Sequence, residues 1–153
     1  MRDGLYVSGV VHSLSSTYLL LDEEDGARVI GYFTVAVDAV RLTGTERRDV
    51  GEPPFPDIGA IRLVMIGVDW NESGNGTGSQ LLEAVVGLCR RVREDVAVRF
   101  LLADVNPTQE GWYAKRQFLR NRHESENRAG RTTISMRLDL AKSTELKLGE
   151  PLN

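Results

Sequence analysis

The residues best suited to chemistry by type and spacing lie in one glycine-rich segment. It reads Ser73-Gly74-Asn75-Gly76-Thr77-Gly78 and falls between an apolar, strand-like run and an amphipathic, helix-like run. Glycine allows positive φ and a close approach of ligand to backbone, and the N–H groups of a helix N-terminus favour phosphate. The segment therefore predicts either a pyrophosphate site or a plain connection in which Thr77 or Ser79 caps the helix.

Two common phosphate loops do not fit this spacing. A Walker A loop needs a lysine after its last glycine, whereas Ser79 and Gln80 follow Gly78. A dinucleotide fold needs G-x-G-x-x-G and an acidic residue that closes a second strand. Here the glycines run G-x-G-x-G, and Glu94 and Asp95 end a helical run instead. The sequence argues against both classes.

Few other side chains offer reactive chemistry. Cys89 is the only cysteine and lies on an apolar stripe of the predicted helix, so it is interpreted as a core residue. One cysteine also excludes a disulfide framework or a cysteine-based zinc site within the chain, and no metal site is predicted. His12 and His123 are the only imidazoles, and Asp69 and Glu72 follow a predicted strand. None of them identifies a general base.

The elements that must position the glycine segment follow from apolar periodicity and from turn residues. A hairpin turn is expected at Asp25-Gly26, and the prolines and glycines of residues 43–60 predict a long loop. The predicted strands are 17–22, 29–42, 61–68, 99–105, 118–123 and 132–140, with a helix from Gly78 to about Glu94 and a short helix at 112–117. This order predicts a mixed α/β fold in which 61–68 and 99–105 are parallel neighbours.

Composition places the chain among ordinary globular proteins. Its 153 residues predict a single domain over 1–153, and 41% apolar with 27% charged residues argues against disorder. No apolar stretch reaches the length needed to cross a bilayer, and the N-terminus does not resemble a secretory signal. A cytoplasmic protein without a membrane partner is therefore expected.

Charge is unevenly distributed along the chain. The formal net charge is −3, but the segment Lys115–Arg137 holds seven bases against Glu124 and Glu126. Two interpretations remain open: the bases form a basic patch suited to RNA phosphates, or they occupy the solvated faces of strands.

Taken together, the motifs resemble the GNAT superfamily of N-acetyltransferases over about residues 17–140. That family places [Gln/Arg]-x-x-Gly-x-[Gly/Ala] after a strand, and Gly76 and Gly78 match its two glycines. Asn106 and Tyr113 stand seven residues apart, as in the family's pantetheine and thioester pattern. Ser73 replaces the usual Gln or Arg, so one side-chain clamp is missing and backbone amides must supply most of the cradle.

The resemblance implies the GNAT acyl-CoA N-acyltransferase fold: a central, mostly antiparallel sheet with one splayed parallel strand pair, and flanking helices. It also implies that acetyl-CoA is the cofactor. The implied cofactor-binding residues are Ile66, Val68, Ser73, Gly74, Asn75, Gly76, Thr77, Gly78, Ser79 and Asn106. The implied catalytic groups are the Val68 N–H, as donor to the thioester oxygen, and Tyr113, as general acid to the departing thiolate.

The acceptor is expected to be a primary amine that attacks the thioester directly in a ternary complex. A narrower resemblance, carried by Val29-Ile30-Gly31-Tyr32-Phe33 and Pro53-Pro54-Phe55-Pro56, points to the GNAT toxins that acetylate aminoacyl-tRNA. It implies tRNA binding through Lys115–Arg137 and an antitoxin partner. The residues before Thr17 are too few for the two helices with which such toxins begin, so either a remodelled substrate side or a shortened N-terminus is expected.

Two further expectations complete the sequence interpretation. A non-catalytic acyl-CoA-binding or interaction module on the same fold would retain the glycine turn but would not need Tyr113. Exposed strand edges in this fold often pair, so a homodimer is also expected.

Overall fold

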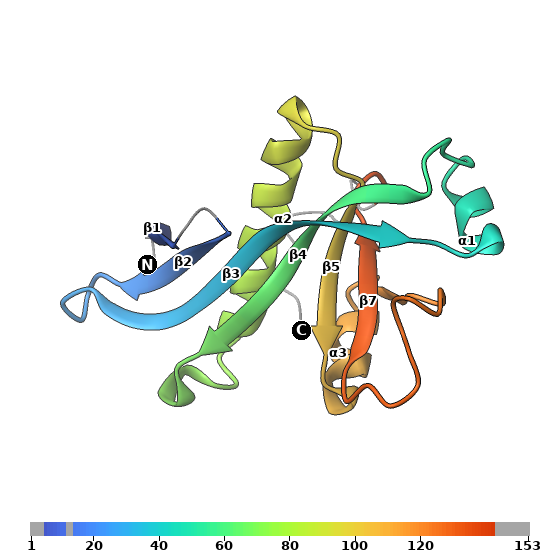
Figure 1. Cartoon of the computed structure of the whole chain (residues 1–153). Coiled ribbons are helices and arrows are strands. Elements are labelled where there is room, and N and C mark those ends of the chain that lie inside the picture. The colour runs from blue at the N-terminus through green and yellow to red at the C-terminus, as the bar shows by residue number, and fades with distance from the viewer. Residues whose placement is uncertain (1–4, 12–13, 143–153) are drawn as a thin grey trace. The chain divides into compact units, whose positions relative to one another are not determined.

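In the computed structural model, residues 5–11 and 14–142 are described. Their strands are β1 (Leu5–Val11), β2 (Ser15–Asp22), β3 (Arg28–Arg41), β4 (Asp57–Val68), β5 (Phe100–Val105), β6 (Leu119–Arg120) and β7 (Ile134–Asp139). Their α-helices are α1 (Gly44–Asp49), α2 (Thr77–Asp95) and α3 (Glu110–Ala114), and two 3-10 turns are η1 (Trp70–Glu72) and η2 (Pro107–Gln109). The hydrogen-bonded strand order is β1-β2-β3-β4-β5-β7-β6 (Figure 1). This is the mixed α/β fold that the sequence predicts.

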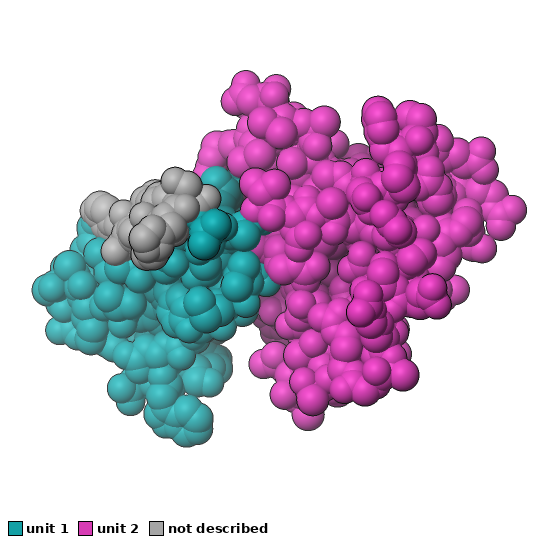
Figure 2. All heavy atoms as spheres, viewed as in Figure 1, with its two compact units in different colours: residues 1–36, 63–88, 147–153 teal, residues 37–62, 89–146 magenta. Residues whose placement is uncertain are grey.

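The chain divides into two compact units, coloured separately in Figure 2. Unit 1 comprises residues 1–36, 63–88 and 147–153, and unit 2 comprises residues 37–62 and 89–146. Strands β3 and β4 and helix α2 contribute residues to both units. The single domain expected over 1–153 stays a prediction.

Unit 1 is built on antiparallel pairing of β1 with β2 and of β2 with β3. The hairpin expected at Asp25-Gly26 is present, and Gly26 has a left-handed φ of +64°. On β2 and β3 the rings of Tyr18 and Phe33 stack with centroids 4.8 Å apart. Gly31 lets α2 approach β3 closely, because a Cβ there would come within 2.8 Å of Leu81 Cδ1.

Unit 2 contains the parallel strand pair. The Gly59 carbonyl accepts from the Arg99 N–H at 2.8 Å, and farther along both strands Arg62 pairs with Asp104 at 3.0 Å. Residue numbers therefore increase in the same direction along both strands, so β4 and β5 run parallel, as their arrows do in Figure 1. The predicted parallel step is therefore confirmed, while β5 and β7 pair antiparallel, as do β6 and β7.

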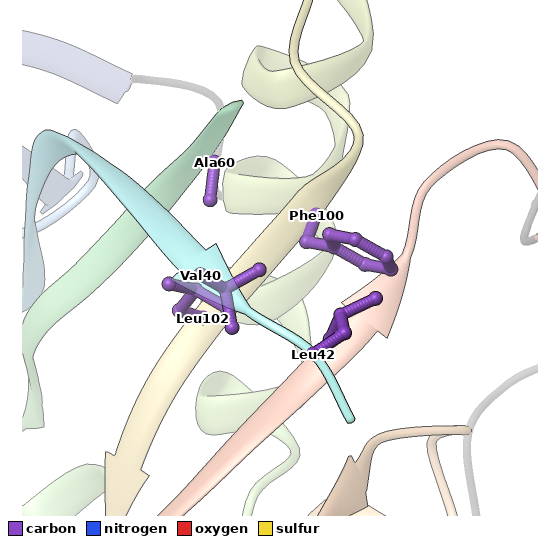
Figure 3. Close-up of a cluster of buried hydrophobic side chains, with 5 residues drawn as sticks. All are labelled: Val40, Leu42, Ala60, Phe100 and Leu102. Carbon is purple, nitrogen blue, oxygen red and sulfur yellow. The ribbon is translucent and has the colours of Figure 1, made fainter. Parts of the chain in front are cut away.

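The core of unit 2 is a cluster of buried side chains from neighbouring strands (Figure 3). Its members are Val40, Leu42, Ala60, Phe100 and Leu102, with Val50 and Ile58 packed against them. Burial of such side chains contributes roughly 1.5–3 kcal/mol each. The cluster therefore holds the ends of β3, α1, β4 and β5 together.

Several boundaries differ from the sequence predictions. β1 was not predicted, α3 begins and ends earlier than the predicted 112–117 helix but overlaps it, and the closing strand expected over 118–123 is only two residues long. The predicted loop 43–60 contains α1 and the start of β4. Helix α1 forms because Thr43 and Glu46 make a reciprocal capping box, while every proline of the segment lies beyond its end.

Candidate functional site

The glycine turn lies in unit 1, between the end of β4 and the start of α2. Gly74 and Gly76 have φ of +83° and +79°, a conformation that favours glycine. A Cβ added at either residue would meet no heavy atom within 4 Å. Glycine is therefore required here by the backbone conformation, and the turn is open to a ligand.

Helix α2 begins directly at this turn. The Gln80 N–H donates to the Gly76 carbonyl at 3.1 Å, as the first turn of the helix requires. The residue that precedes α2 is Gly76, and the cap by Thr77 or Ser79 stays a prediction. Gly78 lies inside the first turn of α2, and the glycines of this segment with a left-handed φ are Gly74 and Gly76. An open turn at the N-terminus of a long helix fits the chemistry of a phosphate site.

The turn is braced by an ion network that the sequence analysis missed. Arg28 of β3 pairs with Asp69 at 2.8 Å and with Glu72 at 2.9 Å. Asp69 also accepts from the Asn71 N–H at 2.9 Å, and its own N–H donates to the Ile30 carbonyl at 2.8 Å. Asp69 and Glu72 thus hold the segment that leads into the turn. Both carboxylates therefore already have partners, and neither is free to serve as a general base.

The predicted acetyl-CoA strand is the last part of β4. Ile66, Gly67 and Val68 are all half-buried. Gly67 permits close packing, because a Cβ there would come within 2.5 Å of the Tyr32 ring. That the main chain of Ile66 and Val68 contacts a cofactor stays a prediction.

Asn106 and Tyr113 belong to unit 2. The Asn106 side-chain oxygen accepts from the Thr108 N–H at 3.0 Å and from the Thr108 hydroxyl at 2.9 Å, so it caps η2. A contact between Asn106 and a ligand would therefore use its side-chain NH₂ group. The residue itself is exposed.

Tyr113 is buried on α3 between two aromatic rings. Its ring meets Trp112 edge to face at 4.8 Å and Phe118 at 5.2 Å. Burial raises the pKa of the Tyr113 hydroxyl, and the charge of nearby Arg116 offsets only part of this effect. The hydroxyl is therefore protonated at neutral pH, as a proton donor must be.

The residues of the predicted site thus fall into two groups. Ile66, Val68 and the segment Ser73–Ser79 belong to unit 1, and Asn106 and Tyr113 belong to unit 2. Within unit 1 the strand end, the braced turn and the helix start form one continuous segment. Within unit 2, η2 connects β5 directly to α3.

The remaining reactive candidates are occupied or lie outside the described residues. Cys89 is fully buried, and burial raises the pKa of its thiol to about 12, which confirms its interpretation as a core residue. The His123 ring makes a 2.7 Å hydrogen bond with the Ser125 hydroxyl and accepts from the Ser125 N–H. His12 lies outside the described residues. Within the described ranges, no group of three His, Cys, Asp or Glu residues could hold a metal ion, and no helix is long and apolar enough to cross a membrane.

The basic segment is largely engaged in contacts of its own. Arg137 is buried and pairs with Glu46 at 2.7 Å. The other engaged bases are Arg116, which lies over the Trp112 ring, Arg120, which pairs with Glu110, and Arg131, which pairs with Asp104. Lys115, Arg122 and Arg128 are exposed and make no ion pair with any described residue. These three bases are the ones placed to meet external phosphates.

Comparisons with known proteins agree with this architecture. No protein-family model matches the chain. A tRNA-acetylating toxin from Mycobacterium tuberculosis is 31% identical over 78 residues, which are 49% of this chain and 45% of the toxin. The match thus spans less than half the length of that relative.

Solved structures match over most of the chain. The toxin AtaT in complex with acetyl-methionyl-tRNA has a TM-score of 0.75 and 18% identity, over 88% of this chain and 76% of that one. An AtaT mutant bound to the C-terminus of the antitoxin AtaR and to acetyl-CoA has a TM-score of 0.67 and 16% identity, over 91% and 76%. The chain therefore has the fold of these AtaT structures, which is the fold that the GNAT resemblance of its motifs implies.

Proposed function

We propose that the chain is an acetyl-CoA-dependent N-acetyltransferase that acetylates the amino group of an aminoacyl-tRNA. The observation that carries the proposal is the left-handed, open turn at Gly74 and Gly76, which joins β4 to the N-terminus of α2 in a GNAT fold. Backbone N–H groups in such a turn suit a pyrophosphate. The residues present therefore fit the cofactor that the resemblance implies.

The acceptor is proposed from the comparisons. The sequence analysis put a generic primary amine first and aminoacyl-tRNA second. The relative with 31% identity is named a tRNA-acetylating toxin, and the AtaT structure contains acetyl-methionyl-tRNA. Both favour the tRNA acceptor, which would place the reaction in the cytoplasm. Lys115, Arg122 and Arg128 are the bases proposed to contact its phosphates, since the other four have partners within the chain.

The GNAT resemblance implies which residues would bind the cofactor and which would take part in catalysis. Acetyl-CoA would supply an activated acetyl thioester. The N–H groups of Ser73–Ser79 would bind its pyrophosphate, while Ile66 and Asn106 would bind pantetheine. The Val68 N–H would donate to the thioester oxygen. Tyr113 would keep its proton on Oη at neutral pH, because burial raises its pKa, and would give that proton to the departing sulfur.

The same proposal includes protein partners. An AtaT mutant was solved with the C-terminus of its antitoxin, so a cognate antitoxin is the proposed regulator of this chain. The homodimer expected from strand pairing also stays a proposal. Growth arrest on expression that a neighbouring gene product relieves would support the toxin assignment. Expression without growth arrest in the native host would count against it.

Cofactor binding is tested by titrating acetyl-CoA calorimetrically into the wild-type chain and into Gly76→Trp. Gly26→Trp is the matched control, because Gly26 also has a left-handed φ and open space where a Cβ would lie, but belongs to the β2–β3 hairpin. Saturable binding is expected for the wild type and for Gly26→Trp, and loss of binding for Gly76→Trp. Equal binding by both variants would remove the glycine turn from the cofactor site.

Turnover is tested with radiolabelled acetyl-CoA and a panel of aminoacyl-tRNAs that includes methionyl-tRNA, beside free amino-acid amides and peptides. Tyr113→Phe keeps the ring between Trp112 and Phe118 but removes the hydroxyl. The expected loss in kcat is roughly 10²–10⁴-fold, with acetyl-CoA binding retained. Transfer only to amides or peptides would restore the generic acetyltransferase hypothesis. Cofactor binding without any transfer would support the non-catalytic module.

A further inference from the structure

Arg116 folds back onto α3, the helix that carries Tyr113, and lies over an aromatic ring of that helix. Its guanidinium carbon lies 3.7 Å from the centroid of the Trp112 ring. Its Nη1 donates to the Trp112 carbonyl at 2.9 Å. One side chain thus holds both the ring and the main chain of Trp112.

The chain after α3 fixes Arg116 in this place. The Arg116 N–H donates to the Tyr113 carbonyl at 2.9 Å, and the Phe118 N–H donates to the same carbonyl at 3.2 Å. Gln117 between them has a left-handed φ of +69°, which turns the backbone sharply. The turn therefore brings the N–H groups of both Arg116 and Phe118, which follow Tyr113 in the chain, back to its carbonyl.

Tyr113 depends on these contacts because α3 is only five residues long. So short a helix has little stability of its own, and packing must hold its side chains. The Tyr113 ring packs edge to face against Trp112, whose ring Arg116 covers in turn. A guanidinium over an indole is a favourable cation–π contact, which holds the Trp112 ring in place.

Arg116 also acts on Tyr113 electrostatically. Burial raises the pKa of the Tyr113 hydroxyl, and the positive charge of Arg116 lowers it toward its ordinary value. Removing that charge would raise the pKa of Tyr113 further. The Tyr113 hydroxyl would then give up its proton less readily, which opposes transfer to a leaving sulfur.

We propose that Arg116 is a positioning residue for Tyr113: it clamps Trp112, and through the Trp112 ring it fixes where the Tyr113 hydroxyl points. The proposal rests on the assignment of Tyr113 as proton donor in the proposed function. It separates Arg116 from Lys115, Arg122 and Arg128, which face outward. Arg116 should therefore control the rate of transfer and not the binding of the tRNA backbone.

The kinetic test compares Arg116→Met, which keeps the length of the stem but loses the charge and the hydrogen bond, with Arg116→Lys. The matched control is Arg91→Met, an exposed base on α2. Initial rates are measured with acetyl-CoA and methionyl-tRNA. Arg116→Met should lower kcat about tenfold and change both KM values by less than about twofold, and Arg116→Lys should recover part of the loss.

Three comparisons decide between positioning and the alternatives. Lys115→Met should instead raise the KM for tRNA at unchanged kcat, and the same pattern in Arg116→Met would show a phosphate contact and overturn the proposal. In a Tyr113→Phe background, Arg116→Met should have less than about a twofold further effect, because the group it positions is gone. A full additional tenfold loss in that background would show that Arg116 acts elsewhere. A loss of far-UV circular dichroism would expose a folding defect, and Arg116→Lys then carries the same tests.

A readout without turnover separates this proposal from the proposed function. With ring-¹³C tyrosine, the Tyr113 Cζ signal is identified by its absence in Tyr113→Phe. Arg116→Met should shift this signal, and Arg91→Met should not. An unmoved signal would overturn the positioning role whatever the activity. A shifted signal in a chain that acetylates no aminoacyl-tRNA would leave the Arg116–Tyr113 coupling standing and reject the proposed function.

Discussion

The buried carboxylate of Glu46 should be the most costly single charge to remove from unit 2. Its Oε1 accepts from Arg137 Nη1 at 2.7 Å and from the Arg122 N–H at 3.1 Å. Its Oε2 accepts from the Thr43 N–H at 2.8 Å and from the Thr43 hydroxyl at 3.0 Å. Glu46→Gln keeps the shape but turns one of these oxygens into a donor that faces two other donors.

The magnitude follows from the burial of the pair. The Arg137 and Glu46 side chains are only 8% and 6% exposed. Breaking a buried ion pair from one side costs roughly 3–5 kcal/mol, because it leaves an uncompensated buried charge. For a chain of this size that is a fall in Tm of roughly 6–20 °C. Glu110→Gln removes the exposed partner of Arg120, and such a surface pair is worth about 0–1 kcal/mol.

The contribution of Glu46 to stability should fall at low pH. Burial alone would raise the pKa of the Glu46 carboxyl, but the Thr43 hydrogen bonds, the Arg137 charge and the Arg122 N–H together hold it below its ordinary value. A carboxyl with a lowered folded-state pKa contributes stability above its unfolded pKa of about 4.3 and loses it as pH falls through the folded value. The stability gap between wild type and Glu46→Gln should be constant from about pH 5 to pH 8 and shrink below about pH 4.

Urea unfolding followed by circular dichroism, at a series of pH values, measures this gap. Glu46→Gln should unfold at much lower urea than the wild type, and Glu110→Gln should unfold close to it. If both variants lie within about 1 kcal/mol of the wild type, the buried pair contributes no more than a surface pair and the reasoning fails. A gap that stays undiminished below about pH 4 would show that the ionised carboxylate is not its source.

Three further predictions test local features. The Cys89 thiol, with a pKa of about 12 in place of 9.0, should be alkylated by iodoacetamide at pH 8 roughly 1,000-fold more slowly in the folded chain than in urea, and equal rates would contradict its burial. Gly67→Ala should destabilise the chain, because its Cβ would lie 2.5 Å from the Tyr32 ring, and Tyr32→Ala should relieve the defect; a double variant no more stable than Gly67→Ala would argue for another cause. Thr43→Ala should cost about 0.5–2 kcal/mol in urea unfolding through loss of the α1 capping box, whereas Thr43→Ser should cost less.

Short sequence patterns predicted those segments whose conformation depends mainly on residues close to them in the chain. The spacing of Leu81, Leu82, Val85, Val86 and Cys89 predicted α2, and those residues are buried. The glycines between β4 and α2 predicted a turn with positive φ, and Gly74 and Gly76 adopt it. Helix α1 was missed because the prolines beyond it dominated the interpretation, while the Thr43–Glu46 capping box was present in the sequence as a usable signal.

The sequence also predicted part of the candidate site. The sequence carries the GNAT resemblance, and the fold that it implies is the one observed. This was predictable because the strand, the glycine turn and the helix follow one another directly along the chain. The brace of Arg28 on Asp69 and Glu72 joins residues more than forty positions apart, so no local pattern could reveal it. The Trp112–Arg116 contact was accessible from the sequence because it joins residues only four positions apart, although Arg116 lies in the turn after α3.

Only the tertiary structure decided which basic side chains are available to an external partner. From sequence, the bases of Lys115–Arg137 form one class with a net positive charge. In the fold, Arg137 is buried against Glu46, 91 residues away, while Lys115 and Arg128 remain exposed. The strength with which a charged side chain acts on a partner depends on the distance between them and on how far each is buried. The fold sets both quantities. Sequence therefore determined the local cradle of the proposed cofactor site, and the fold determined which bases are left for a partner.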